Sequence, residues 1–440
     1  MAWHWARATS PSGHERVIRV NPNEIRSGFQ DLLESRQAKW LPETTLLSSD
    51  PETFFTISTF LKVKPFVVGR VIEPLRLATA QRCLRGKPEL LAIVGREGIA
   101  TVFSSMMSFF LLSEAESFLG EEVLLRFLGD ALGLSIDNLY CVAAVEDQAS
   151  IDRIVFLGIP PDHIVLVPAA CLKWELPSTA NGLVGRYIRF FKRHASGLAP
   201  VGDLNRIRTR AGTEVLIDSS FLIETLTVVT EDARHLYATP LFAGSLRQLA
   251  ARDPAGRLDV RARWLFVNLL RAVVAALADG ALPSANGAGF LLRKLLRTAM
   301  LTADVTAGAE LWLPAVAAGS FEDLAYLGYE WSSEEQTKAF GILGAEARAF
   351  QKLVQRARSW LPREITRRGT ITNDDLAKWK ESRGIPEELA RSVLHELGVA
   401  AEPQALSLRT AVPMYPLDDR AADWDARDWL YRLHAQRLQA

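Results

Sequence analysis

The chain has 440 residues, of which 48% are hydrophobic and 23% are charged, so it can bury large apolar cores in two or three domains. Its 51 basic and 51 acidic residues give a formal net charge of zero, so any contact with nucleic acid must come from local patches. Three widely spaced cysteines exclude a disulfide framework and a CxxC zinc site, and they fit a reducing cytoplasm.

The first half of the chain alternates short strand and helix patterns. Asn21 and Pro22 predict the start of a helix, since an Asn cap followed by Pro is a common helix beginning. Aromatic and β-branched residues predict strand segments in 52–70 and an antiparallel pair in 91–113. Further along, we expect a helix at 117–132, short strands or strand–helix alternations at 138–144, 153–157 and 163–167, a loop at 177–186, and a strand at 215–218 before an apolar helix.

From residue 240 onward the pattern is helical. The apolar spacing predicts helices at 243–251, 259–279, 289–303, 321–327, 334–359, 373–383 and 387–397, and a final short helix at 421–436. The apolar run 264–278 is too short for a membrane span and contains Asn268 and Arg271, so we expect no membrane association. The N-terminus has no apolar signal core. A boundary between a mixed α/β half and an all-α half is expected within 235–255.

Residues 279–301 combine a turn-rich segment with a helix that has a basic face. Arg293 and Arg297 are four residues apart and therefore share a face, with Lys294 beside them. Cations held on one helix face can contact a phosphate backbone. The same spacing also fits an ordinary amphipathic helix with a solvated basic face, and periodicity alone does not separate the two interpretations.

Five stretches, in the same order along the chain, resemble the alanyl-tRNA synthetase family. They are NEIRSGFQDLLESRQ (23–37), LLSSDPETFFTISTF (46–60), TAQRCLR (79–85), DGALPSANGAGFLLRKLLR (279–297) and ESRGIP (381–386). The resemblance implies an α+β fold, with a class II synthetase-like antiparallel sheet and flanking helices followed by an all-α domain that binds the tRNA acceptor stem. We expect a catalytic-like domain over 1–240, a tRNA-binding-like domain over 241–400 and a C-terminal tail or helix over 401–440.

The family's editing and C-terminal domains have no counterpart in this sequence. Because the family uses its C-terminal domain for self-association, we expect a shortened, cytoplasmic paralogue that is a monomer or a weak dimer. The partners implied are tRNA, in the family the alanine-specific one, and a small-molecule or nucleoside acceptor.

The ATP-binding positions of the family are altered here. Synthetases of this class hold the triphosphate with arginines and with close backbone approach at glycine. The arginine of the second motif falls on Ile99, and in the third motif a glycine falls on Leu222 and an arginine on Thr225. Arg96 lies three residues from the first of these positions and is the weak remaining candidate for nucleotide binding. We therefore expect no bound cofactor and no metal site, and the alternative is ATP with magnesium.

The amino-acid half of the site is retained. Trp174 falls on the tryptophan that walls the family's alanine pocket, and Asp218 falls on the aspartate that pairs with the alanine ammonium group. The alternative is that Trp174 is a core residue and Asp218 caps a strand end. No catalytic residue can be named, because the scattered His, Cys and Ser residues lack the context of a nucleophile.

On the tRNA side, the resemblance implies phosphate contacts by Arg293, Lys294 and Arg297. The asparagine that reads the acceptor stem falls on Ala285, with Asn286 adjacent, and the later aspartate falls on Glu381. Backbone binding is therefore expected, whereas the replaced asparagine removes the family's basis for specificity toward the alanine tRNA.

Three functions remain open. The first is an aminoacyltransferase that moves alanine between tRNA and a small nucleoside-like or amine acceptor in secondary metabolism, such as antibiotic biosynthesis, without ATP activation. The second is a non-catalytic, tRNA-binding pseudo-synthetase with a regulatory role. The third is an ATP-dependent ligase with a rebuilt site that uses Arg96 and either Arg186 or Arg189.

Overall fold

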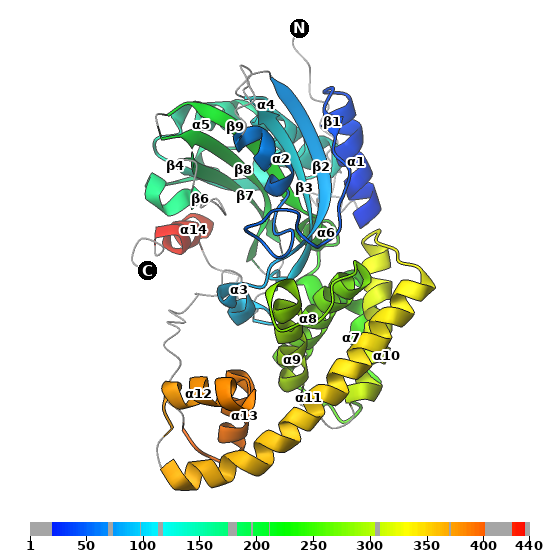
Figure 1. Ribbon diagram of the computed structural model, residues 1–440. Coiled ribbons are helices and arrows are strands. Elements are labelled where there is room, and N and C mark those ends of the chain that lie inside the picture. Colours follow the sequence, from blue (N-terminus) through cyan, green and yellow to red (C-terminus); the bar gives the residue numbers. More distant parts are fainter. Residues whose placement is uncertain are drawn as a thin grey trace.

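The computed structural model describes residues 20–68, 74–96, 98–112, 118–174, 183–194, 197–210, 212–303, 309–368, 371–400 and 425–435. Within these ranges the first half forms one mixed sheet whose strands are ordered β1-β2-β3-β9-β8-β7-β4-β5, with β6 paired to β7 (Figure 1). The strands are β1 (Lys39–Trp40), β2 (Leu75–Leu84), β3 (Phe103–Leu112), β4 (Leu139–Ala144), β5 (Ile164–Val167), β6 (Lys173–Trp174), β7 (Leu183–His194), β8 (Gly197–Thr209) and β9 (Glu214–Leu222).

The centre of this sheet is antiparallel, from β2 through β3, β9, β8 and β7 to β4, while the edge pairs β1–β2 and β4–β5 are parallel. The predicted class II-like sheet with flanking helices is confirmed. The helices of this half are α1 (Pro22–Glu34), α2 (Phe60–Val68), α3 (Pro88–Ile93), α4 (Leu119–Arg126), α5 (Gln148–Phe156) and α6 (Ile223–Thr230).

The two faces of the sheet are covered differently. One face packs against α1 and α4, where Phe29, Phe127 and Phe221 make edge-to-face contacts with ring centroids 4.8–5.3 Å apart. The other face carries α2 over one apolar cluster and α14 (Ala426–Ala435) over a second, and these two helices flank the region that holds the candidate site (Figure 1).

Several local predictions were wrong. Residues 60–68 of the predicted strand region 52–70 form helix α2, because Phe60, Val63 and Val67 share the helix face that packs on the sheet. Residues 153–156, for which a strand or a strand–helix alternation was expected, lie in helix α5. The described residues of 91–113 form no antiparallel pair with each other, since 91–93 end helix α3 and the strand β3 pairs with β2 and β9. Of the predicted loop 177–186, residues 183–186 belong to strand β7, and 177–182 lie outside the described ranges.

The second half is helical, as predicted. Its helices are α7 (Ala243–Ala250), α8 (Val260–Ala278), α9 (Gly287–Thr302), α10 (Ala309–Tyr326), α11 (Ser333–Arg368), α12 (Asn373–Arg383) and α13 (Glu387–Glu396). Helix α8 lies at the centre and is buried from Phe266 to Ala278. The long helix α11 runs from α10 to the α12–α13 pair (Figure 1). The largest apolar core is continuous through both halves, so α8 and α9 share it with the sheet.

Candidate functional site

A row of polar side chains crosses the sheet face between α2 and α14. Asp218 of β9 lies beside Asn205 of β8, whose Nδ2 donates to Asp218 Oδ2 over 3.1 Å and to Ser220 Oγ over 3.2 Å. On the other side, the Ser108 hydroxyl of β3 is 2.7 Å from the Thr59 hydroxyl. Asp218 is 3% exposed, and its Oδ1 has no hydrogen-bond partner among the described residues. A buried acceptor without a partner favours a ligand that donates to it.

Burial raises the pKa of Asp218 to about 7, although hydrogen bonds from Ser108 and Asn205 oppose this shift. The carboxyl therefore exchanges its proton near neutral pH. A ligand ammonium placed against it would stabilise the ionised form.

Trp174 lies on the same sheet face as Asp218. It pairs with Gly185 of β7, and a Cβ atom at Gly185 would come within 2.8 Å of Trp174 Cε3. Its indole meets Phe60 edge to face at 5.3 Å and packs on the cluster that contains Leu216, two residues before Asp218. The structure thus brings the two predicted alanine-pocket residues onto one face, and their role in binding an amino acid stays a prediction.

A pocket of about 210 Å³ opens at the end of this polar row. Ser220, which Asn205 joins to Asp218, forms part of its wall. The other lining residues are Arg85, Leu90, Ile93, Ile99, Ala100, Thr101, Ser104, Met106, Arg189, Pro200, Gly202, Asp203, Phe221, Leu222 and Thr225. We call this the sheet pocket. Ile99, Leu222 and Thr225, the three altered ATP positions, all line it, so the replaced residues share one site.

Two arginines line the sheet pocket. Arg189 makes two 2.7 Å hydrogen bonds to the carboxylate of Asp203, and this carboxylate neutralises the charge of Arg189. Arg85 donates to Ile57 O over 2.8 Å and contacts Met106 Sδ at 2.9 Å, with no carboxylate partner in the described part of the chain. Arg85 is therefore the cation available to an anionic ligand. Sequence reasoning missed it, although it ends the quoted stretch TAQRCLR.

The other arginines considered for a nucleotide lie elsewhere. Arg96 is exposed and does not line the sheet pocket. Arg186 forms an ion pair with Asp147, and it precedes Arg189 by three residues on β7, so its side chain projects from the opposite face of the sheet. A rebuilt triphosphate site at these positions would therefore rest on Arg189 alone.

Helix α8 holds one rim of the sheet pocket. Asn268 Oδ1 accepts from Val102 N over 2.9 Å, and its Nδ2 donates to Ala100 O over 3.3 Å. Arg271, which is fully buried, donates to Thr101 Oγ1 over 2.9 Å and to Phe103 O over 3.3 Å. Asn268 and Arg271, the two polar residues of the buried part of α8 (266–278), thus fix the backbone at the start of β3.

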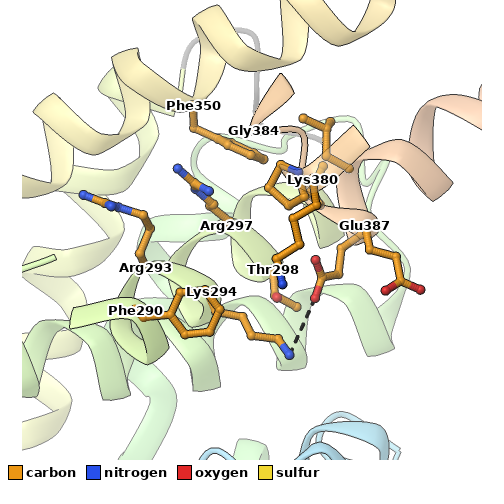
Figure 2. A pocket seen from close by; sticks show the side chains of 13 residues that line it. Phe290, Arg293, Lys294, Arg297, Thr298, Phe350, Lys380, Gly384 and Glu387 are labelled. Carbon is orange, nitrogen blue, oxygen red and sulfur yellow. Dashed lines mark ion pairs between the residues drawn. The ribbon is translucent and has the colours of Figure 1, made fainter. Parts of the chain in front are cut away.

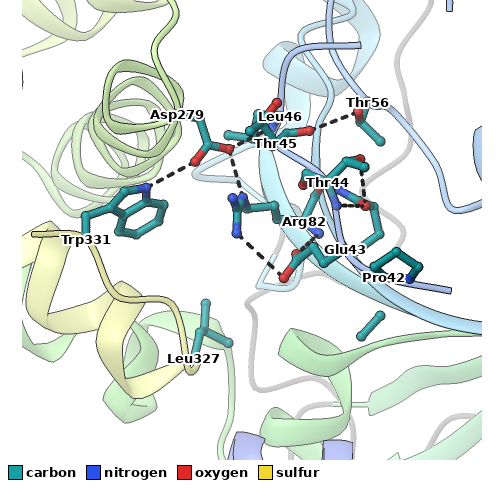
Figure 3. Close-up of polar contacts among 12 residues, drawn as sticks. Pro42, Glu43, Thr44, Thr45, Leu46, Thr56, Arg82, Asp279, Leu327 and Trp331 are labelled. Atoms are coloured by element: carbon teal, nitrogen blue, oxygen red, sulfur yellow. Dashed lines mark hydrogen bonds and ion pairs between the residues drawn. The ribbon is translucent and has the colours of Figure 1, made fainter. Parts of the chain in front are cut away.

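A second link between the halves centres on Asp279, at the end of α8 (Figure 3). Its Oδ2 accepts from Arg82 Nε over 2.8 Å and from Leu46 N over 2.6 Å, and its Oδ1 accepts from Trp331 Nε1 over 3.1 Å. Arg82 also pairs with Glu43, where burial is the main cause that raises the carboxyl pKa. The carboxylate that opens the basic stretch 279–301 therefore ties β2 to the helical half.

The predicted basic face of α9 is partly used within the protein. Arg293 makes two hydrogen bonds to Glu346 of α11, over 2.8 and 3.0 Å, and donates to Ser284 O over 2.9 Å. Lys294 lies 3.6 Å from Glu388 of α13 (Figure 2). Arg297 has no carboxylate partner among the described residues, and its guanidinium carbon lies 5.4 Å from the centre of the Phe350 ring.

Ala285, where the family's base-reading asparagine falls, is exposed, and so are the adjacent Asn286 and the later candidate Glu381. Asn286 caps α9 in an exposed turn, and its side chain accepts no hydrogen bond from that helix. Gly287 follows with φ +58°, a conformation that favours glycine. Glu381 is exposed on α12. RNA contacts by all five residues of the predicted tRNA-binding set stay predictions.

The described residues include no group of three or more His, Cys, Asp or Glu side chains placed to hold a metal ion. No helix in the described ranges is long and apolar enough to cross a membrane.

Comparison with known proteins agrees with this architecture. Residues 213–410 match the family model of class II (A) tRNA synthetases. An alanine–tRNA ligase of Desulforudis audaxviator is 24% identical over 87% of this chain and 47% of its own length, and that of Thermotoga maritima is 23% identical over 88% and 48%. The chain thus spans about half the length of these relatives.

Among solved structures, histidyl-tRNA synthetase of S. aureus aligns with a TM-score of 0.34 and 12% identity, covering 48% of this chain and 66% of that one. Pyrrolysyl-tRNA synthetase of Desulfitobacterium hafniense aligns with a TM-score of 0.32 and 9% identity, covering 49% and 71%. The chain is therefore similar to alanine–tRNA ligases over most of its length, and residues 213–410 carry its match to the class II (A) tRNA synthetases.

Proposed function

We propose that the protein is an aminoacyltransferase that takes an aminoacyl group, alanine by resemblance, from tRNA and passes it to a small nucleoside-like or amine acceptor. The observation that carries this proposal is Asp218, a buried carboxyl with a free oxygen beside a pocket that lacks the expected triphosphate cations. Such a site suits the ammonium group of an amino acid that arrives already activated.

The chemistry needs no ATP, because the ester that joins an amino acid to tRNA is already reactive. The acceptor nitrogen attacks the ester carbonyl carbon, a C–N bond forms, and the C–O bond to the terminal ribose breaks. The proton lost by the nitrogen passes to the ribose oxygen. In this step the protein's task is to position both partners, with Asp218 against the ammonium group and the sheet pocket around the acceptor.

Pre-charged alanyl-tRNA, incubated with a panel of nucleosides and amines in the absence of ATP, tests the proposal. We expect acceptor-dependent loss of the ester and a new aminoacylated product by mass spectrometry. Asp218→Asn should slow this transfer at least tenfold, because the ammonium loses its ionic partner. Asp130→Asn, a change at a side chain that is 50% exposed, is the control. Ester loss at the buffer rate, unchanged by Asp218→Asn, would refute the proposal.

A second candidate function is tRNA binding without chemistry. It is favoured by the three replacements that share the sheet pocket, Ile99, Leu222 and Thr225, together with the unpaired Arg297 in the helical half. It predicts RNA affinity that falls steeply with salt, because bound phosphates release counterions. Salt-dependent binding with no transfer to any acceptor would select this function over the first.

A further inference from the structure

A second pocket lies in the helical half, between α9, α11 and the junction of α12 with α13 (Figure 2). It encloses about 240 Å³, and we call it the helical pocket. Its wall contains four cationic side chains, namely Arg293, Lys294, Arg297 and Lys380. It also contains two aromatic rings, Phe290 and Phe350, and two carboxylates, Glu387 and Glu388.

The charges of this wall do not cancel. Arg293 is paired with Glu346 and Lys294 with Glu388, while Glu387 is paired with Arg391 behind the wall. Arg297 and Lys380 have no carboxylate partner within the described ranges. Two positive charges therefore remain for a ligand.

Arg297 is also short of a hydrogen-bond acceptor. Its Nε is buried and has no partner among the described residues. Burial, reinforced by the nearby Arg293, lowers the pKa of Arg297. The charged form of this side chain is therefore less favourable in the folded protein than in water. A buried, positively charged donor without an acceptor favours an anionic ligand that accepts a hydrogen bond from it.

The aromatic rings accompany the two unpaired cations. The Arg297 guanidinium carbon lies 5.4 Å from the centre of the Phe350 ring, and Lys380 Nζ lies 5.9 Å from the centre of the Phe290 ring. Phe290 is 44% exposed, so its ring is open to a ligand. Cations interleaved with aromatic rings are the arrangement that binds single nucleotides, the rings stacking on the base and the cations holding the phosphate.

The charge count selects the kind of phosphate. An internal phosphodiester of RNA carries one negative charge, whereas a terminal monoester carries about −1.5 to −2 at neutral pH. Two unpaired cations match the monoester. We propose that the helical pocket binds the 5′-terminal nucleotide of an RNA, with its phosphate monoester between Arg297 and Lys380 and its base against Phe290. This inference rests on the tRNA-binding part of the proposed function.

Two acceptor-stem minihelices, identical except for a 5′-monophosphate or a 5′-hydroxyl end, test the inference by fluorescence anisotropy. We expect the wild-type protein to prefer the phosphorylated RNA by about tenfold, since charge-assisted hydrogen bonds supply the difference. Arg297→Met and Lys380→Met, which keep the apolar stems, should each remove most of this preference. Lys352→Met, at an exposed position of α11 outside the pocket, should retain it.

The outcomes separate the inference from the function that underlies it. Equal affinity for the two RNAs, or a preference that survives both pocket variants, overturns the inference and leaves tRNA binding intact. No binding of either RNA overturns both. GMP serves as the probe for a free nucleotide. If GMP binds to the wild type, Arg297→Met abolishes this binding, and the two RNAs bind equally, the pocket binds a free nucleotide and the inference that it binds an RNA end is wrong. Circular dichroism confirms that each variant is folded.

Discussion

Asp279 accepts a 2.8 Å hydrogen bond from the Arg82 guanidinium, and these two residues lie 197 positions apart in the sequence. The same carboxylate accepts from Trp331 and from the backbone of Leu46, so three segments of the chain meet at one side chain. The Asp279 side chain is 2% exposed and that of Arg82 is 18% exposed, so the pair is largely shielded from water.

Asp279→Ala should destabilise the fold by on the order of 3 kcal/mol, because it leaves the partly buried Arg82 cation without its main partner. Urea unfolding measures this loss. Glu396→Ala, which breaks the exposed Arg358–Glu396 pair, is the matched control and should cost less than about 1 kcal/mol. Equal effects of the two variants would show that the Asp279 link contributes no more than a surface ion pair.

Gly289→Ala should disturb the turn that precedes α9. A Cβ atom there would lie 2.2 Å from Leu282 O and 2.5 Å from Ser284 N, and neither backbone atom can move without opening the turn. We expect a loss of about 1–3 kcal/mol in thermal or urea unfolding.

Gly341→Ala is the control for this substitution. No atom of the described residues lies within 4 Å of a Cβ atom at this position of α11, so alanine should stabilise the helix by about 0.5–1 kcal/mol. Opposite signs for the two variants are the expected result, and the same sign for both would contradict the steric argument.

The stability of the protein should depend on pH through Asp218. Its pKa is raised from 3.8 to about 7 in the folded state, so between these values the unfolded chain is ionised while the folded protein keeps the proton. The contribution of Asp218 to the free energy of unfolding is therefore fully present below about pH 4 and is lost as the pH rises toward 7, by on the order of 4 kcal/mol. The variant Asp218→Asn has no carboxyl at this position and does not show this loss.

The free energy of unfolding of Asp218→Asn, minus that of the wild type, should thus rise from pH 4 to pH 7 and then level off. Denaturant unfolding at half-unit intervals of pH measures the difference, in which the titration of all other groups cancels. A difference that does not change with pH would show that Asp218 ionises normally.

An alanyl-sulfamoyl-adenosine mimic of the adenylate should bind at least tenfold more tightly than ATP in calorimetry. The mimic has no β- and γ-phosphates, and Arg85 is the lining cation of the sheet pocket that has no carboxylate partner in the described ranges. Arg85→Met should weaken the mimic about tenfold, whereas Arg96→Met should not change its affinity. Alanine-dependent pyrophosphate exchange by the wild type would instead support the ATP-dependent ligase.

The helical half could be predicted well from sequence, because its helices are long and their apolar spacing is regular. Helix α10 shows the limit. Only 321–327 was expected, yet the helix spans Ala309–Tyr326, and its apolar residues are spread around the helix, so it has little periodicity to detect. Helix α2 shows another limit, since its aromatic and β-branched residues favour a strand while their contacts with the sheet favour a helix.

The site was only partly predictable. Trp174 and Asp218 were found through the resemblance, and the structure adds that they share a sheet face. Arg85, Asn268 and Arg271 were not assigned to the site, because their partners lie far away in sequence. Asn268 binds Val102 across 166 positions, and such pairings follow from the packed fold and leave no local pattern.

Helix α11 contains 36 residues, which at a rise of 1.5 Å per residue makes it about 54 Å long. Near its start it packs against α10, and beyond its far end follow α12 and α13, which form one wall of the helical pocket (Figure 1). A tilt of about 5° at the N-terminal end of a helix of this length displaces its C-terminal end by roughly 5 Å. A slight repacking of α10 against α11 would therefore widen or close the helical pocket, which lies far from that contact.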